Sequence, residues 1–118
     1  MAKTLDELMT LPGVVMAAEF GDDGSLVDVR GNIERRIAEM AARMIASTNR
    51  TFKQHAEQFT KESGMKWIPV LGWAVTGGDY TVAVMGKRGV FVETAAGDWK
   101  KPDFNKLFQE LQGHFLVD

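Results

Sequence analysis

Residues 32–64, which carry the strongest indication of the fold, read NIERRIAEMAARMIASTNRTFKQHAEQFTKESG. Asn32 is a residue type that favours a helix N-cap, Gly64 is one that favours a helix end, and nothing between them breaks a helix. We therefore predict one helix from Ile33 to Ser63. At about 1.5 Å per residue it spans about 46 Å, which is more than the core of a small domain needs. Part of this helix is expected to meet another molecule.

The predicted helix is amphipathic, because apolar residues recur every three or four positions along one broad stripe. The stripe consists of Ile33, Ile37, Met40, Ala41, Met44, Ile45, Thr48, Phe52, Ala56 and Phe59. The opposite side carries Arg35, Arg36, Glu39, Arg43, Arg50, Lys53 and Glu57. The stripe is so broad that its pattern leaves open which residues face the chain's own sheet and which face a partner.

Before the helix, the sequence predicts a β-hairpin. Residues 14–20 are almost continuously apolar, residues 21–25 contain an Asp-Gly turn, and an extended apolar pattern resumes at Leu26, Val27 and Val29. A first strand that is apolar on both faces indicates a sheet with helices above and below it.

After the helix, three further strands are expected at Trp67–Val75, Tyr80–Met85 and Gly89–Thr94. Their connectors are short and rich in glycine, which favours an antiparallel meander. Pro69 lies inside the first of these predicted strands. Proline cannot donate a hydrogen bond to a ladder, so this strand is expected at a sheet edge.

A short helix is predicted at each end of the chain. Thr4 and Glu7 have the spacing of a capping box, and Pro12 with Gly13 ends the helix that follows. Near the C-terminus the apolar residues Phe104, Leu107, Phe108 and Leu111 recur at helical spacing.

Length and composition indicate one domain, residues 1–118, of a cytoplasmic protein. The chain has 118 residues, a formal net charge of -2 and no cysteine. This charge disfavours binding to nucleic acid, and no apolar run approaches the roughly 20 residues that a membrane span needs. The N-terminus does not fit a secretory signal. The lack of cysteine excludes thiolate nucleophiles and cysteine-ligated metal sites, and no cofactor is expected.

No catalytic motif is found. His55 and His114 lack the spacing of a metal site, and no serine lies in the context of a nucleophile elbow. An enzyme site assembled from Asp79, Glu93 and His114 has no motif behind it, so the chain is not expected to be an enzyme.

The aromatic residues Trp67, Trp73 and Tyr80 lie close together in the sequence. They fit packing in a core or interface, and they also fit the lining of a pocket between the sheet and the long helix. A small-molecule sensor is therefore kept as the alternative to an interaction domain.

The order of the predicted elements resembles the roadblock (dynein light chain) family. The opening from Leu5 to Val14, which contains Pro12-Gly13-Val14, together with Ala17-Ala18 and the Asp22-Asp23-Gly24 turn, is similar to the start of that family. The resemblance covers roughly residues 4–112. Within it, the pieces 72–75 (GWAV) and 77–80 (GGDY) are similar to a bacterial subgroup with no assigned function.

The resemblance implies a roadblock/profilin-like α+β fold: a five-stranded antiparallel sheet of order 2-1-5-4-3, with the long helix on one face and two terminal helices on the other. It also implies a non-catalytic homodimer that pairs through the long helix and the third strand. Pro69 would weaken pairing of that strand. Such proteins act as scaffolds or regulatory subunits that dock other proteins. Small GTPases and metabolic or redox complexes are the kinds of partner that the resemblance implies, and no sequence feature selects one of them. The predicted core or dimer contacts are Ile37, Met40, Met44, Ile45, Thr48, Phe52, Trp67 and Trp73.

Overall fold

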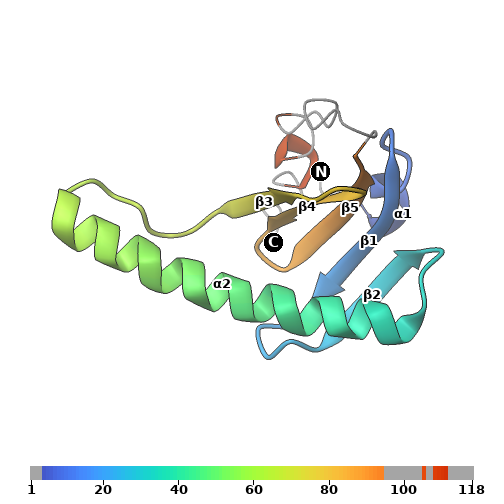
Figure 1. The fold of residues 1–118 in the computed structure, drawn as a ribbon, viewed down its shortest axis with the longest axis horizontal. Helices are drawn as coiled ribbons and strands as arrows, with labels where there is room; N and C mark the ends of the chain where they lie inside the picture. The colour runs from blue at the N-terminus through green and yellow to red at the C-terminus, as the bar shows by residue number, and fades with distance from the viewer. Residues whose placement is uncertain (1–3, 95–104, 106–107, 112–118) are drawn as a thin grey trace.

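The structure is a computed structural model that describes residues 4–94, 105 and 108–111. At its centre is a five-stranded antiparallel sheet of order β2-β1-β5-β4-β3 (Figure 1). The strands are β1 (Val14–Phe20), β2 (Leu26–Gly31), β3 (Gly72–Thr76), β4 (Tyr80–Met85) and β5 (Arg88–Glu93), and the helices are α1 (Leu5–Leu8) and α2 (Arg35–Ser63). The predicted strand order is confirmed.

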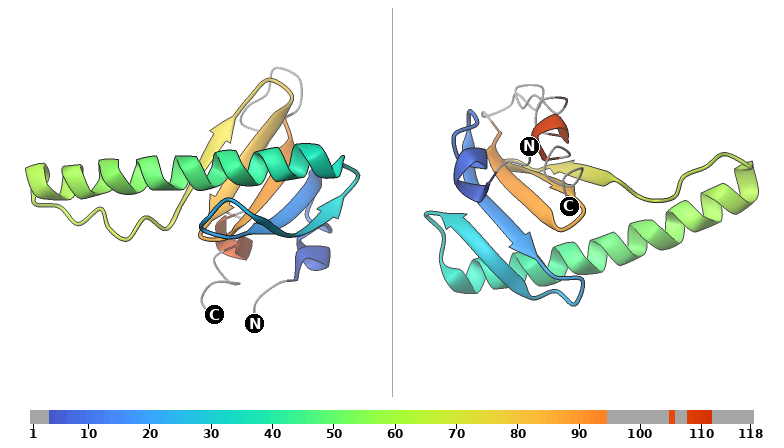
Figure 2. Two further views of the ribbon diagram at one scale, coloured as in Figure 1. Left: turned by 90° about the horizontal axis from the view of Figure 1, so that it is seen from below. Right: turned by 180° about the vertical axis from the view of Figure 1, so that it is seen from behind.

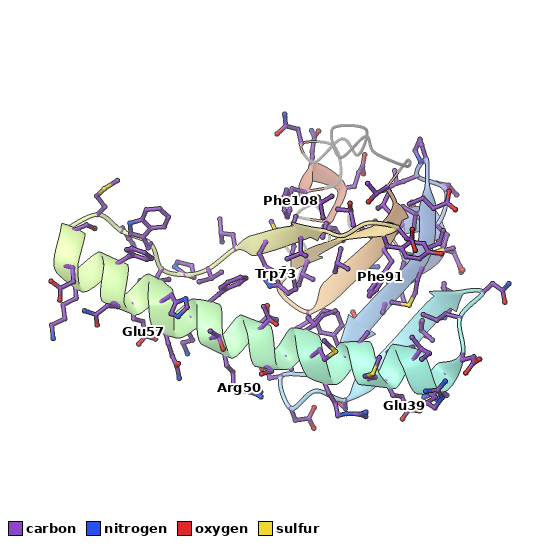
Figure 3. All side chains as sticks on the ribbon, in the orientation of Figure 1. Glu39, Arg50, Glu57, Trp73, Phe91 and Phe108 are labelled. Atoms are coloured by element: carbon purple, nitrogen blue, oxygen red, sulfur yellow. The ribbon has the colours of Figure 1, made fainter. Side chains whose placement is uncertain are left out.

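Both faces of the sheet are covered, as the apolar β1 predicted. Met16, Ala18 and Phe20 of β1 pack with α2 on one face, whereas Ala17 packs on the other face with α1 and with Leu111. The described C-terminal residues 105 and 108–111 are helical, while Phe104 and Leu107 lie outside the described residues. Figure 3 shows Trp73 and Phe91 between sheet and helix, and Phe108 on the opposite side. The predicted three-layer arrangement is confirmed.

Helix α2 is unbroken, but it begins two residues later than predicted. Its N-cap is Glu34, which makes no side-chain capping hydrogen bond, and not Asn32. Ile33 is half-buried against the core between helix and sheet, so this part of the chain must first reach the core before it turns into the helix. The C-terminal end agrees with the prediction. Gly64 adopts a φ of 75°, and its N–H donates a hydrogen bond to the carbonyl oxygen of Thr60.

The C-terminal half of α2 projects past the edge of the sheet, and residues 64–71 return beside it (Figures 1 and 2). The prediction that a strand begins at Trp67 is wrong, because β3 begins only at Gly72. Pro69 therefore lies in the irregular returning segment, where its missing N–H does not interrupt the ladder. The position of β3 at the edge of the sheet is confirmed.

Helix α1 has the capping box that the sequence predicted. The Thr4 hydroxyl oxygen accepts a hydrogen bond from the Glu7 N–H at 3.1 Å, and Oε1 of Glu7 accepts one from the Thr4 N–H at 3.1 Å. The helix buries Leu5 and Leu8 against the sheet face opposite α2. A helix of a single turn gains most of its stability from such packing.

Candidate interaction surface

The side of α2 that faces the sheet is built mostly from small residues. Ala38, Ala42, Ile45 and Ala46 are buried there. Their small side chains let the helix lie close to the sheet. The exposed large side chains of the helix must therefore be sought on its other sides.

One side of α2 carries no charge from Ile37 to Phe59, and we call it the uncharged flank. Its residues recur at helical spacing and are Ile37, Met40, Ala41, Met44, Thr48, Thr51, His55 and Phe59. Met44 is 61% exposed and Met40 is 42% exposed. Flexible thioether side chains of this kind adapt well to a partner surface. An isolated chain thus leaves apolar helix surface in water.

We call the opposite side of α2 the charged flank, and it faces the β1–β2 and β4–β5 turns. Its charged residues are Arg35, Arg36, Glu39, Arg43, Arg50, Lys53 and Glu57. The Arg50 guanidinium donates a hydrogen bond to the carbonyl oxygen of Asp22 in the β1–β2 turn at 3.4 Å. Farther toward the N-terminus, Arg35 forms an ion pair with Glu39. Figure 3 shows Arg50 projecting from α2 on the side away from β3. The two flanks thus have opposite chemical character.

The sheet also carries apolar residues on the face that α2 covers. Val75, Val82 and Phe91 are in register across β3, β4 and β5. They lie toward the end of the sheet that is opposite the β4–β5 turn. The charged flank faces that turn, so these three residues lie on the side of the uncharged flank. Val75 is 53% exposed, and Val82 and Phe91 are half-buried. Helix and edge strand thus both present exposed apolar side chains.

A hydrogen bond and an aromatic contact hold α2 on the edge of the sheet. The indole Nε1–H of Trp73 donates to Oδ1 of Asn49 at 2.6 Å, and Nδ2 of Asn49 reaches the Gly86 carbonyl oxygen at 3.4 Å. The Trp73 ring also meets the Phe52 ring edge-on, with ring centroids 5.6 Å apart. This geometry is favourable for aromatic pairs.

A second aromatic contact ties the returning segment to the projecting end of α2. The rings of Phe59 and Trp67 are 5.6 Å apart, and the Trp67 N–H donates to the Thr60 hydroxyl at 3.0 Å. Phe59 is 57% exposed and Trp67 is 50% exposed. Met65 and Leu71 nearby are each 61% exposed. The projecting end is therefore ordered by a few contacts while most of its apolar surface stays in water.

The predicted contact residues fall into three groups. Ile45 is only 6% exposed, so it belongs to the core between helix and sheet. Ile37, Thr48, Phe52 and Trp73 are half-buried, and Phe52 and Trp73 contact each other. Met40, Met44 and Trp67 are exposed. The structure thus separates residues that the breadth of the sequence stripe left together, although the predicted role of the exposed ones is still a prediction.

Sequence reasoning missed Asn49 and Val75. Asn49 is a polar residue inside a helix, and nothing in its local sequence shows that it bonds to a strand 24 positions away. Val75 lies in a predicted strand, but its exposure depends on where α2 crosses the sheet. The alternation of Trp73 and Val75 was the one signal that they share a face.

A groove lies beside the charged flank, between α2, the returning segment and the β4–β5 turn. Its volume is about 840 Å³, and its lining includes Asn49, Lys53, Leu71, Trp73 and Lys87. This groove offers space for a ligand near the helix and the sheet. Of the aromatic residues considered for a pocket, Trp73 lines it, whereas Trp67 and Tyr80 do not.

In residues 4–94, 105 and 108–111, no group of three or more His, Cys, Asp or Glu side chains is placed to hold a metal ion. Within the same residues, no helix is both long and apolar enough to cross a membrane. Asp79 and Glu93 lie at one end of neighbouring strands, and His114 lies outside the described residues.

The fold is that of the roadblock class. The Roadblock/LC7 domain from Streptomyces avermitilis superposes with a TM-score of 0.74 at 14% identity, covering 92% of this chain and 85% of that chain. Myxococcus xanthus MglB superposes with a TM-score of 0.61 at 14% identity, covering 97% of this chain and 93% of that chain. By sequence, the chain belongs to the family of uncharacterized conserved proteins DUF2173, whose model matches residues 4–113. No curated protein was found to match.

Proposed function

We propose that the protein is a non-catalytic scaffold or regulatory subunit of the cytoplasm that forms a homodimer from single 118-residue domains and docks other proteins. The observation that carries this proposal is the exposed apolar surface on the uncharged flank of α2 and at the sheet edge formed by β3. Met44, Met40 and Val75 are exposed on it. Large exposed apolar surfaces of soluble domains mark interaction sites.

The geometry favours a second copy as the occupant of this surface. Strand β3 ends the sheet, so its outer backbone groups are open to a further antiparallel strand. Because β3 and the uncharged flank adjoin, a two-fold axis beside β3 would join the two sheets and bring the two α2 helices together. A flank that runs from Ile37 to Phe59 is about 33 Å long, which suits an interface of standard size.

The docking role is supported by the fold class and by the absence of a catalytic motif from the sequence. The roadblock resemblance implies scaffolding of small GTPases, motor complexes or signalling assemblies, and a metabolic or redox complex is the second kind of partner considered. No residue described here distinguishes between these partners. Protein docking of this kind needs a rigid platform, which a joined sheet and helix pair would provide.

Light scattering on the purified chain tests the dimer. The expected mass is twice the 13.1 kDa of one chain, and it should persist at tens of micromolar because an interface of this size resists dilution. A mass of 13.1 kDa at that concentration would contradict the proposal.

A small-molecule sensor is the alternative, and the groove beside the charged flank favours it. Its volume of about 840 Å³ is within the usual range for ligand sites. Native mass spectrometry of the purified chain would show a retained ligand, and a metabolite library would raise the melting temperature. If neither effect is found, this alternative loses its support.

A further inference from the structure

The groove beside the charged flank has two ends of different character. One end is apolar and is formed by Ile68, Val70, Leu71 and Trp73. The other end continues into a smaller hollow of about 340 Å³ between α2 and the β1–β2 and β4–β5 turns. The two hollows share Asp22, Asn49, Lys53, Gly86 and Lys87, so together they form one channel along the molecule.

The second end is basic. Arg50, Lys53 and Lys87 line it, and Asp22 is the one acidic residue among the described residues of its lining. Within the described part of the chain, the amino groups of Lys53 and Lys87 form neither an ion pair nor a hydrogen bond, whereas other ion pairs of the protein are formed. Their charges are therefore available to an anionic ligand.

Among the described residues, the two hollows together are lined by four basic residues, Arg50, Lys53, Lys66 and Lys87, and by three acidic ones, Glu19, Asp22 and Glu57. Glu19 already interacts within the chain. Glu57 lines the larger hollow and is absent from the lining of the basic end. Apolar and positive surfaces thus lie next to each other and are suited to an occupant that carries apolar and negative groups in sequence.

The main chain of the returning segment favours a peptide as that occupant. Among the described residues, the single hydrogen bond made by the main chain of residues 66–71 is the one from the Trp67 N–H to Thr60. The peptide groups of Ile68, Val70 and Leu71 can therefore pair with an extended chain laid beside them. Leu71 is 61% exposed, which shows that the groove is open along its rim. An enclosed cavity would suit a small molecule better.

We infer that this groove binds an extended acidic segment of a partner protein, with an apolar side chain at Leu71 and Trp73 and carboxylates at Lys53 and Lys87. The inference rests on the proposed docking role and names the chemistry of the docked partner. The groove adjoins the charged flank, whereas the proposed dimer uses the uncharged flank and the outer edge of β3.

Fluorescence polarisation of the full chain with a short labelled peptide, in which Leu and Phe alternate with Asp and Glu, tests this inference. Lys53→Glu should weaken binding about fivefold to tenfold, while Lys61→Glu, an exposed control on the same helix, should leave it unchanged. Leu71→Ser should weaken binding about tenfold, whereas Val27→Ser, at a position 59% exposed on β2, should not. Added salt should weaken binding to the unaltered chain.

Three results would overturn the inference. The first is that the peptide does not bind at millimolar protein. The second is that the groove variants and their controls lose binding equally. The third is that laurate, a fatty acid that is also apolar and negative, binds in the groove and excludes the peptide. Light scattering on Lys53→Glu and Leu71→Ser separates failure of this inference from failure of the proposed dimer. Both variants should keep the mass of the unaltered chain even where they lose the peptide.

Discussion

The indole nitrogen of Trp73 and Oδ1 of Asn49 are joined by a hydrogen bond of 2.6 Å between strand β3 and helix α2. Together with the Phe52–Trp73 contact and the core between helix and sheet, this bond sets the position at which the helix crosses the edge of the sheet. The same contacts determine which residues of α2 remain exposed, including the uncharged flank.

Asn49→Ala should lower the free energy of unfolding by about 1–2 kcal/mol, because a half-buried indole N–H loses its acceptor. Chemical denaturation measures this change. Gln54→Ala is the control, since Gln54 lies on the same helix with an exposed side chain and should change stability by less than about 0.5 kcal/mol. Equal stability of the two variants would show that the Trp73–Asn49 bond does not hold the helix in place.

Met44→Glu should convert the dimer to a monomer that remains folded. A carboxylate at the centre of an apolar interface lacks a partner, so the dissociation constant should rise at least about 100-fold, or about 3 kcal/mol. Met44 is 61% exposed within one chain, which explains why the fold itself should survive. Sedimentation velocity measures the dissociation, and circular dichroism measures the folding.

Gln54→Glu is the matched control for Met44→Glu, since it adds the same charge to the same helix outside the uncharged flank. It should leave the dimer intact. Dimers of equal strength in both variants would place the interface elsewhere on the molecule.

The pKa of Asp28 should depend on Arg30. The Arg30 guanidinium donates a 2.6 Å hydrogen bond to Asp28, the Val29 N–H donates a second, and these bonds hold the pKa of the Asp28 carboxyl below its ordinary value. The folded state thus has the lower pKa. The resulting stabilisation is present above about pH 4 and is lost as the pH falls through the folded-state pKa.

Arg30→Gln should therefore raise the pKa of Asp28 in an NMR titration of its side-chain carboxyl carbon. Asp23 is an internal control, because its pKa is lowered by the hydroxyl and N–H of Ser25 and does not involve Arg30. An unchanged Asp28 titration would show that the hydrogen bond from Arg30 is not formed in solution.

Much of the fold could be predicted from the sequence because its local signals agree with one another. The capping box at Thr4 and Glu7, the apolar β1 and the glycine at position 64 each predicted an element that the structure contains. The errors lie where tertiary packing overrides local preference. Ile33 packs against the core, so the helix starts after Glu34, and the segment around Pro69 is not paired with β4.

The candidate surface was harder to predict, because exposure on a broad helical stripe depends on the crossing with the sheet. Ile45 and Met44 are neighbours in the sequence, yet Ile45 is buried in the core and Met44 is exposed. The hydrophobic pattern treats both in the same way. Their separation needed the position of Trp73 beneath Asn49, a contact between residues 24 positions apart.

Thr48 provides the most direct test of the proposed self-association. It lies midway between Ile37 and Phe59 on the uncharged flank, and a residue at the centre of a two-fold interface meets its own copy. The chain contains no cysteine, so Thr48→Cys introduces a single thiol into each protomer. Mild oxidation followed by electrophoresis without reductant should give a cross-linked dimer, whereas Gln54→Cys should stay monomeric on the gel. Absence of the Thr48→Cys cross-link, or equal cross-linking of both variants, would contradict pairing through this flank.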